Sequence, residues 1–159
     1  MLMRKTTLLV LSILIMIAVS APLYGIAQAV QKPCTQDENL RAEKAVDNLR
    51  TWDEIYRYFR LYGRCDDVDA EEGSSGAVAH ILASHWETLH RVSQLAAKDK
   101  GFRKFVIYSV SSVDSMNDVQ KIREDAIHRC PAGLHQLCKD LRVEADEAIE
   151  EDASVHKNP

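Results

Sequence analysis

Four cysteines, Cys34, Cys65, Cys130 and Cys138, restrict the fold of this chain more than any other feature. An even number of cysteines in an exported protein is typical of disulfide bonds. A zinc site is the alternative, but zinc-binding cysteines usually come as closely spaced pairs. Successive cysteines here lie 31, 65 and 8 residues apart. The sequence therefore predicts two disulfides and no metal site.

Export itself is predicted by the first 29 residues, which resemble a secretory signal peptide. Two basic residues precede an apolar run over residues 8–19, and Ala27-Gln28-Ala29 supplies the small residues needed for cleavage. A retained membrane anchor is the competing interpretation, because the run approaches the length of a membrane span. Pro22 and Gly25 argue against it. We expect cleavage after Ala29, a periplasmic location and no membrane association afterwards.

The charge that remains after cleavage limits the classes of partner. Residues 1–29 hold two of the 20 Lys and Arg residues and none of the 24 Asp and Glu residues, so the net charge changes from −4 to −6. This disfavours a nucleic-acid or anionic-lipid partner and permits a basic protein. Because no linker or repeat divides the chain, we expect one helical domain over residues 30–150 and a flexible tail over residues 151–159.

Two capping boxes mark the first two helix starts, Thr35-Gln36-Asp37-Glu38 and Thr51-Trp52-Asp53-Glu54. Apolar residues follow each at helical spacing, and Gly63 offers a left-handed end to the second helix. The short link between the helices predicts antiparallel packing. Since Cys34 precedes the first helix and Cys65 follows the second, we expect these two cysteines to be bonded.

The remaining pair, Cys130 and Cys138, sets a condition on the chain between them. Eight residues of continuous helix would separate their Cα atoms by about 12 Å, whereas a disulfide requires less than about 7 Å. Part of this segment must therefore be non-helical. Cys130-Pro131-Ala132-Gly133 fits a type I turn, with proline at the second position and glycine at the fourth.

The middle of the chain leaves two alternatives open. The third helix begins near Asp69, or else at Ser74 or Ser75, which would leave residues 65–75 as an exposed acidic loop; it then continues through His85 to Leu89. The run FVIYSV could form a strand, but helix is favoured because no second strand is available to pair with it. A loop over residues 111–114 and two further helices, the first capped by Ser115, complete an all-α bundle of about six helices.

Known catalytic and metal-binding patterns are missing from the sequence. His80, His85 and His90 recur at five-residue spacing, so no two of them share a helix face as metal ligands would. Carboxylate pairs such as Glu71–Glu72 lie in a charged, exposed context that does not favour acid–base chemistry. We therefore expect a binding protein rather than an enzyme, without a cofactor.

Four segments carry a resemblance to a known family: GRCDD at residues 63–67, HWETL at 85–89, GFRKFVIYSV at 101–110 and CPAGLHQLC at 130–138. Together they resemble the periplasmic immunity proteins that neutralise amidase toxins of type VI secretion systems, over residues 34–141. Members of that family are helical and often dimeric, and they place a loop or helix in the active-site groove of a cell-wall amidase. The resemblance implies an amidase partner, a homodimer and inhibition by occlusion.

Two segments are candidates for contacting such a partner. The first is an acidic stretch followed by two serines: Asp66, Asp67, Asp69, Glu71, Glu72, Ser74 and Ser75. The second is a short polar loop small enough to enter a cleft: Ser111, Ser112, Asp114, Ser115 and Asn117. Acidic side chains would speed the encounter with a basic groove. The alternative is that the carboxylates only stabilise a helix start and the loop only connects two helices.

Other functions compatible with the sequence are inhibition of a different enzyme, such as a lysozyme, and transport of a small apolar ligand. A carrier would need a sizeable apolar cavity within the helix bundle. An enzyme with an unfamiliar site is the third class.

Overall fold

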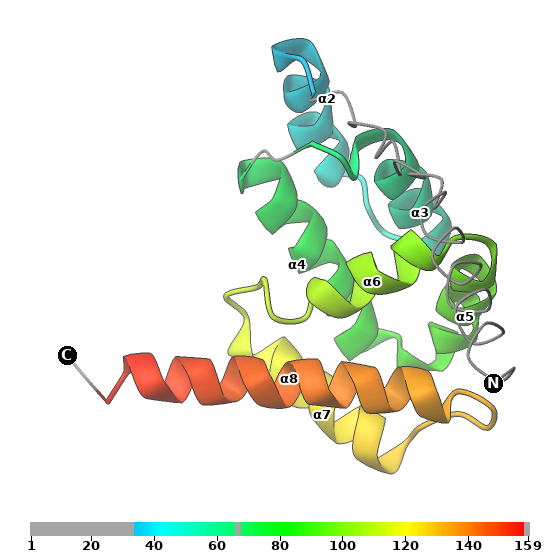
Figure 1. The fold of residues 1–159 in the computed structure, drawn as a ribbon, viewed down its shortest axis with the longest axis vertical. Helices are drawn as coiled ribbons and strands as arrows, with labels where there is room; N and C mark the ends of the chain where they lie inside the picture. The colour runs from blue at the N-terminus through cyan, green and yellow to red at the C-terminus, as the bar shows by residue number, and fades with distance from the viewer. Residues whose placement is uncertain (1–33, 66–67, 158–159) are drawn as a thin grey trace, which may run out of the picture. The chain divides into compact units, whose positions relative to one another are not determined.

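The computed structural model describes residues 34–65 and 68–157. Seven α-helices and one short 3-10 helix follow one another in these residues, labelled as in Figure 1: α2 (Gln36–Val46), α3 (Trp52–Tyr62), α4 (Val68–Ser84), η1 (Trp86–Thr88), α5 (Leu89–Lys98), α6 (Lys100–Tyr108), α7 (Met116–His128) and α8 (His135–Val155). The described part contains no strand, which confirms the predicted all-α fold. The predicted signal peptide, Asp66 and Asp67 lie outside the described residues.

The predicted helical hairpin of α2 and α3 forms, with the predicted capping box at the start of α2. The Thr35 hydroxyl accepts a hydrogen bond from the Glu38 backbone N–H, and the Glu38 carboxylate accepts one from the Thr35 N–H at 2.8 Å. At α3 the Thr51 hydroxyl accepts from the Glu54 N–H, as predicted, whereas the Glu54 carboxylate accepts from the N–H of Arg50, one residue before the cap. The predicted Cys34–Cys65 disulfide is confirmed, with the two Cα atoms 5.2 Å apart. It joins the start of α2 to the end of α3.

Gly63 ends α3 in a different way from the prediction. Its φ is −62°, so it is right-handed, and its N–H bonds to the Phe59 carbonyl at 2.9 Å. A Cβ at this position would lie 2.6 Å from the same carbonyl oxygen. Glycine is therefore required here for space and not for a left-handed φ.

Helix α4 settles one alternative and corrects another prediction. Because it begins at Val68, residues 68–75 are helical and do not form an exposed loop. It ends at Ser84, whereas the sequence predicted that the helix would continue through His85, whose φ and ψ are −134° and 46°. Tertiary hydrogen bonds hold this break. The Trp86 indole donates to the Arg129 carbonyl at 2.9 Å, and the Trp52 indole donates to the Thr88 hydroxyl at 2.7 Å.

The FVIYSV run is helical, as favoured, and most of it lies in α6. Asp99 caps this helix by accepting a hydrogen bond from the Gly101 N–H at 2.9 Å. Helix α7 begins where the sequence predicted, but the Ser115 side chain makes no capping hydrogen bond. The predicted cap by the Ser115 side chain is therefore not formed.

The predicted Cys130–Cys138 disulfide is also confirmed, with the Cα atoms 5.9 Å apart. The turn within it lies one residue later than predicted, because the closing hydrogen bond runs from the Leu134 N–H to the Pro131 carbonyl at 3.1 Å. Gly133 is left-handed there, with φ of 80°, which is unfavourable for other residues. Helix α8 then continues to Val155, so residues 151–155 of the predicted tail are helical.

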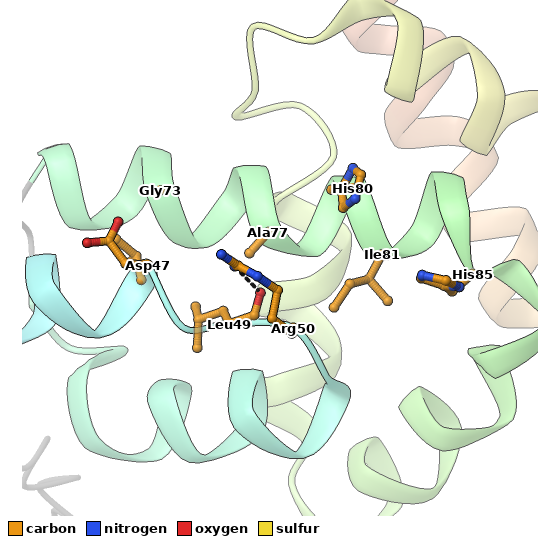
Figure 2. Close-up of a pocket in the computed structure, with 9 residues that line it drawn as sticks. Asp47, Leu49, Arg50, Gly73, Ala77, His80, Ile81 and His85 are labelled. Carbon is orange, nitrogen blue, oxygen red and sulfur yellow. Dashed lines mark hydrogen bonds between the residues drawn. The ribbon is translucent and has the colours of Figure 1, made fainter.

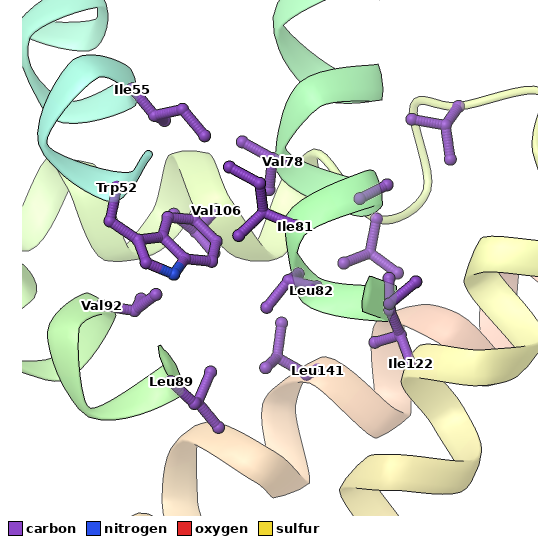
Figure 3. Packing of buried hydrophobic residues seen from close by; sticks show 14 of the residues in the cluster. Trp52, Ile55, Val78, Ile81, Leu82, Leu89, Val92, Val106, Ile122 and Leu141 are labelled. Carbon is purple, nitrogen blue, oxygen red and sulfur yellow. The ribbon is translucent and has the colours of Figure 1, made fainter. Parts of the chain in front are cut away.

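The core is built around α4, which contacts α2, α3 and α7, while α8 packs along α7 (Figure 1). Figure 3 shows side chains from six helices converging on this core: Trp52, Ile55, Val78, Ile81, Leu82, Leu89, Val92, Val106, Ile122 and Leu141. No helix in the described part is both long and apolar enough to cross a membrane. The exposed side of α4 forms part of the candidate partner-binding surface.

Candidate partner-binding surface

The first turns of α4 and the α6–α7 loop line one hollow of about 360 Å³. We call it the acidic groove, and its lining consists of Asp69, Glu72, Gly73, Gly76, Val113, Asp114 and Ser115. Two residues from each of the segments that the sequence singled out, Asp69 and Glu72 and then Asp114 and Ser115, therefore lie on one surface. Glycines at two of the α4 positions leave the groove open.

Carboxylates dominate the electrostatics of the acidic groove. Asp69, Glu72 and Asp114 are exposed, and none of them has an ion-pair partner in the described part of the chain. Among the residues that the structure describes, no lysine or arginine lines the groove. Uncompensated charges of one sign along a hollow attract ligands of opposite charge and raise the rate of encounter. The arrangement favours a basic partner.

Ser74 and Ser75 of the predicted site lie apart from the acidic groove. Their relative exposures are 2% and 1%, and they border a different hollow. The Ser74 hydroxyl donates to the Glu71 carbonyl at 3.1 Å. Glu71 is exposed but borders the same hollow as these serines, beside Tyr58 and Tyr62. The helical period of α4 separates these residues from Asp69 and Glu72.

The predicted residues of the polar loop also lie at different places in the structure. Ser111 and Ser112 each have a hydroxyl within hydrogen-bonding distance of the Tyr108 carbonyl, at 3.1 and 3.2 Å, so they close the end of α6. Asn117 is exposed on α7 but is not part of the groove lining. Only Asp114 and Ser115 of the predicted loop residues border the acidic groove.

A second hollow, of about 500 Å³, lies between α4 and the link that joins α2 to α3 (Figure 2). We call it the histidine groove, lined by Val46, Asp47, Leu49, Arg50, Gly73, Ala77, His80, Ile81 and His85. No pattern in the sequence had indicated this groove. One feature of the sequence could have indicated the histidine groove: a short non-helical link joins two capped helices. Such a link exposes polar side chains next to the helix that packs against it.

Gly73 lines both grooves, so they adjoin along α4. In Figure 2, Ala77 and Ile81 point from α4 toward Leu49 and form an apolar floor. Arg50 donates to the Leu49 carbonyl at 3.0 Å and lies on the rim. The combined surface is thus negative at the acidic groove and carries a cation and two histidines at the histidine groove.

Cysteine and histidine are the side chains best suited to nucleophilic or metal chemistry. All four cysteines are bonded, so the chain has no free thiol. Within residues 34–65 and 68–157, no cluster of three or more His, Cys, Asp or Glu side chains could hold a metal ion. His80, His85 and His90 are all exposed; His80 lies on α4, His85 in the break between α4 and η1, and His90 on α5.

Shifted pKa values belong to helix caps and to ion pairs between helices. In the caps, hydrogen bonds from the Thr35 and Arg50 backbone N–H groups lower the pKa of Glu38 and of Glu54, respectively. Hydrogen bonding from the Arg91 guanidinium lowers the pKa of Asp53, which connects α3 to α5. The Arg60 guanidinium lowers the pKa of Asp99 in the same manner, and the backbone N–H of Gly101 adds to the effect. These ion pairs join α3 to α5 and α3 to the start of α6.

The fold and surface define a class of protein: an all-α, disulfide-bonded domain with open, charged grooves. No protein-family model, curated protein or solved structure matches the chain.

Proposed function

We propose that this protein is a periplasmic immunity protein that binds a type VI secretion peptidoglycan amidase and inhibits it by occluding the active site. The observation that carries the proposal is the acidic groove, where Asp69, Glu72 and Asp114, which have no ion-pair partner among the described residues, meet in one hollow. The resemblance of residues 34–141 to immunity proteins supplies the class of partner.

Rigidity supports the proposal, because a tight inhibitor loses less entropy when its binding surface is already ordered. The Cys34–Cys65 bond closes the hairpin that flanks α4, and Cys130–Cys138 closes the turn before α8. Disulfides form in oxidising compartments such as the periplasm. The same bonds are therefore consistent with the compartment in which a cell-wall amidase acts.

Occlusion would use the two sides of the acidic groove differently. Asp69, Glu72 and Asp114 would steer a basic surface of the amidase toward the groove. Asp114 and Ser115 lie on the short connection between α6 and α7, which is anchored at both ends and could enter a cleft. Asp66 and Asp67 stay predicted contributors to the acidic side. We also propose that the protein is a homodimer, as the resemblance implies.

The test uses the full chain and a purified type VI secretion peptidoglycan amidase, with association and dissociation rates measured at several salt concentrations. The variant Asp69→Asn/Glu72→Gln/Asp114→Asn removes the charge of the groove. We expect association to slow by about tenfold or more and its salt dependence to weaken.

The matched control is Glu147→Gln/Glu150→Gln/Glu151→Gln, which neutralises three exposed carboxylates on α8. It changes the net charge equally, so it should leave most of the association rate intact. Equal slowing in both variants would mean that net charge and not the groove steers binding. A wild-type chain that fails to inhibit peptidoglycan hydrolysis by the amidase would refute the proposed function.

A further inference from the structure

A third groove lies between α5, α6 and the start of α8 and shares no lining residue with the acidic or histidine groove. Its volume is about 680 Å³, and most of its exposed lining is apolar. The apolar side chains that form its floor are Ala96, Ala97, Ile107, Leu134 and Leu137. We call it the lysine groove, for the residues on its rim.

Positive charge is concentrated at the rim of the lysine groove. Lys100 and Lys104 are exposed and have no ion-pair partner among the described residues. Arg103 is bound to Asp140 at 2.6 Å, and Gln136 donates to the other oxygen of that carboxylate at 2.7 Å. The single acid of the groove is thus already neutralised, which leaves both lysines available.

The floor of the lysine groove is held in place before any ligand arrives. The Cys130–Cys138 disulfide closes the loop that carries Gly133 and Leu134, and both of these residues line the groove. Leu134 and Leu137 are also part of the buried core. A preformed apolar floor reduces the entropy that a bound ligand must offset.

We propose that the lysine groove binds a single-chain anionic amphiphile, with a carboxylate between Lys100 and Lys104 and an alkyl chain on the apolar floor. A fatty acid has this chemistry. Small-ligand sites typically enclose about 300–1,000 Å³, with mainly apolar walls and a few polar groups that orient the ligand. The excess of positive charge stands out because the whole chain has a net charge of −4. A carboxylate therefore complements this groove and not the acidic one.

The experiment titrates the purified full chain with 11-(dansylamino)undecanoic acid and follows the rise in dansyl fluorescence. We expect saturable binding that Lys100→Glu/Lys104→Glu weakens by about tenfold or more. The methyl ester of the probe, which lacks the negative charge, should bind the wild-type chain with similarly reduced affinity. Ala97→Trp should also weaken binding, because the indole would fill the floor.

The matched control is Lys44→Glu/Lys157→Glu, which makes the same charge change at exposed lysines outside the groove. Circular dichroism establishes that each variant is folded. Equal affinity in the two double variants would overturn the proposal, as would the absence of saturable binding by the wild-type chain. If the chain co-sediments with phosphatidylglycerol vesicles but does not bind the monomeric probe, the proposal would be overturned. The groove would then bind a lipid surface.

Discussion

Gly73 of α4 lies directly against Val46 of α2: a Cβ built on Gly73 would be 2.8 Å from Val46 Cγ2 and 3.1 Å from Val46 Cβ. Valine is branched at Cβ and has little rotamer freedom with which to move aside. The two helices can therefore approach this closely only because residue 73 has no side chain. Gly73 also borders both the acidic and the histidine grooves, so this contact shapes the candidate surface.

Alanine should have opposite effects at the two glycines of α4. Gly73→Ala should lower the free energy of unfolding by about 1–3 kcal/mol, because the added methyl group forces α2 and α4 apart. A Cβ at Gly76 meets nothing within 4 Å. Gly76→Ala should therefore raise the free energy of unfolding by up to about 1 kcal/mol through helix propensity alone. Urea denaturation measures both. An increase in stability for Gly73→Ala would contradict the packing argument.

Bulky substitutions should distinguish the two ends of the polar loop in binding to the amidase. Ser115 is exposed at the acidic groove, whereas Ser112 closes the end of α6 and does not line the groove. Ser115→Phe should therefore accelerate dissociation by about tenfold, a typical effect at a central contact. Ser112→Phe serves as the comparison and should change the dissociation rate little. Similar dissociation rates for both variants would place the contact surface elsewhere.

Acid should weaken the fold partly through Asp99. Its pKa is lowered, first by the hydrogen bond from Arg60 and then by the backbone N–H groups of Gly101 and Phe102. A carboxyl group with a lower pKa in the folded state stabilises that state above its unfolded pKa, and the contribution is lost as pH falls through the folded value. The wild-type chain should therefore lose more stability than Asp99→Asn between about pH 5 and pH 3. Urea titrations at several pH values test this, and parallel pH profiles would contradict it.

The two disulfides should differ in their contribution to stability. Cys34 and Cys65 are separated by 31 residues and Cys130 and Cys138 by 8, so the first bond restricts the unfolded chain more. Loop-closure entropy predicts that Cys34→Ser/Cys65→Ser costs about 1 kcal/mol more than Cys130→Ser/Cys138→Ser. Denaturation of the two double variants gives this difference. A larger loss from opening the short loop would show that native-state contacts outweigh chain entropy.

A homodimer at micromolar concentration is expected in analytical sedimentation. The resemblance implies it, and the structure leaves one aromatic side chain exposed for such a contact: Tyr108 is 56% exposed, whereas Trp86 is buried against Arg129. Further large apolar side chains are exposed, namely Leu40, Leu61, Ile127, Val143 and Val155. A species with the mass of a single chain at all concentrations would remove the proposed dimer.

Local features of the sequence were sufficient for the helix class, the first two helix starts and both disulfides. Thr35 and Thr51 cap their helices through residues three positions away, so the capping interactions depend only on neighbouring sequence. The first disulfide could be predicted because the short link makes the first two helices antiparallel. The second could be predicted because a continuous helix cannot bring Cys130 near Cys138. The two candidate segments were found for a similar reason, since charge and turn residues are visible in sequence alone.

Contacts between distant residues determined everything else. The break at His85 depends on tryptophan hydrogen bonds that span 36 and 43 residues, while the local apolar periodicity favours an uninterrupted helix. Packing buried Ser74 and Ser75 and turned Asp69 and Glu72 toward Asp114. The histidine and lysine grooves each combine segments that no local pattern links. A groove is a property of how helices are juxtaposed, and that juxtaposition is fixed by side-chain packing across the whole core.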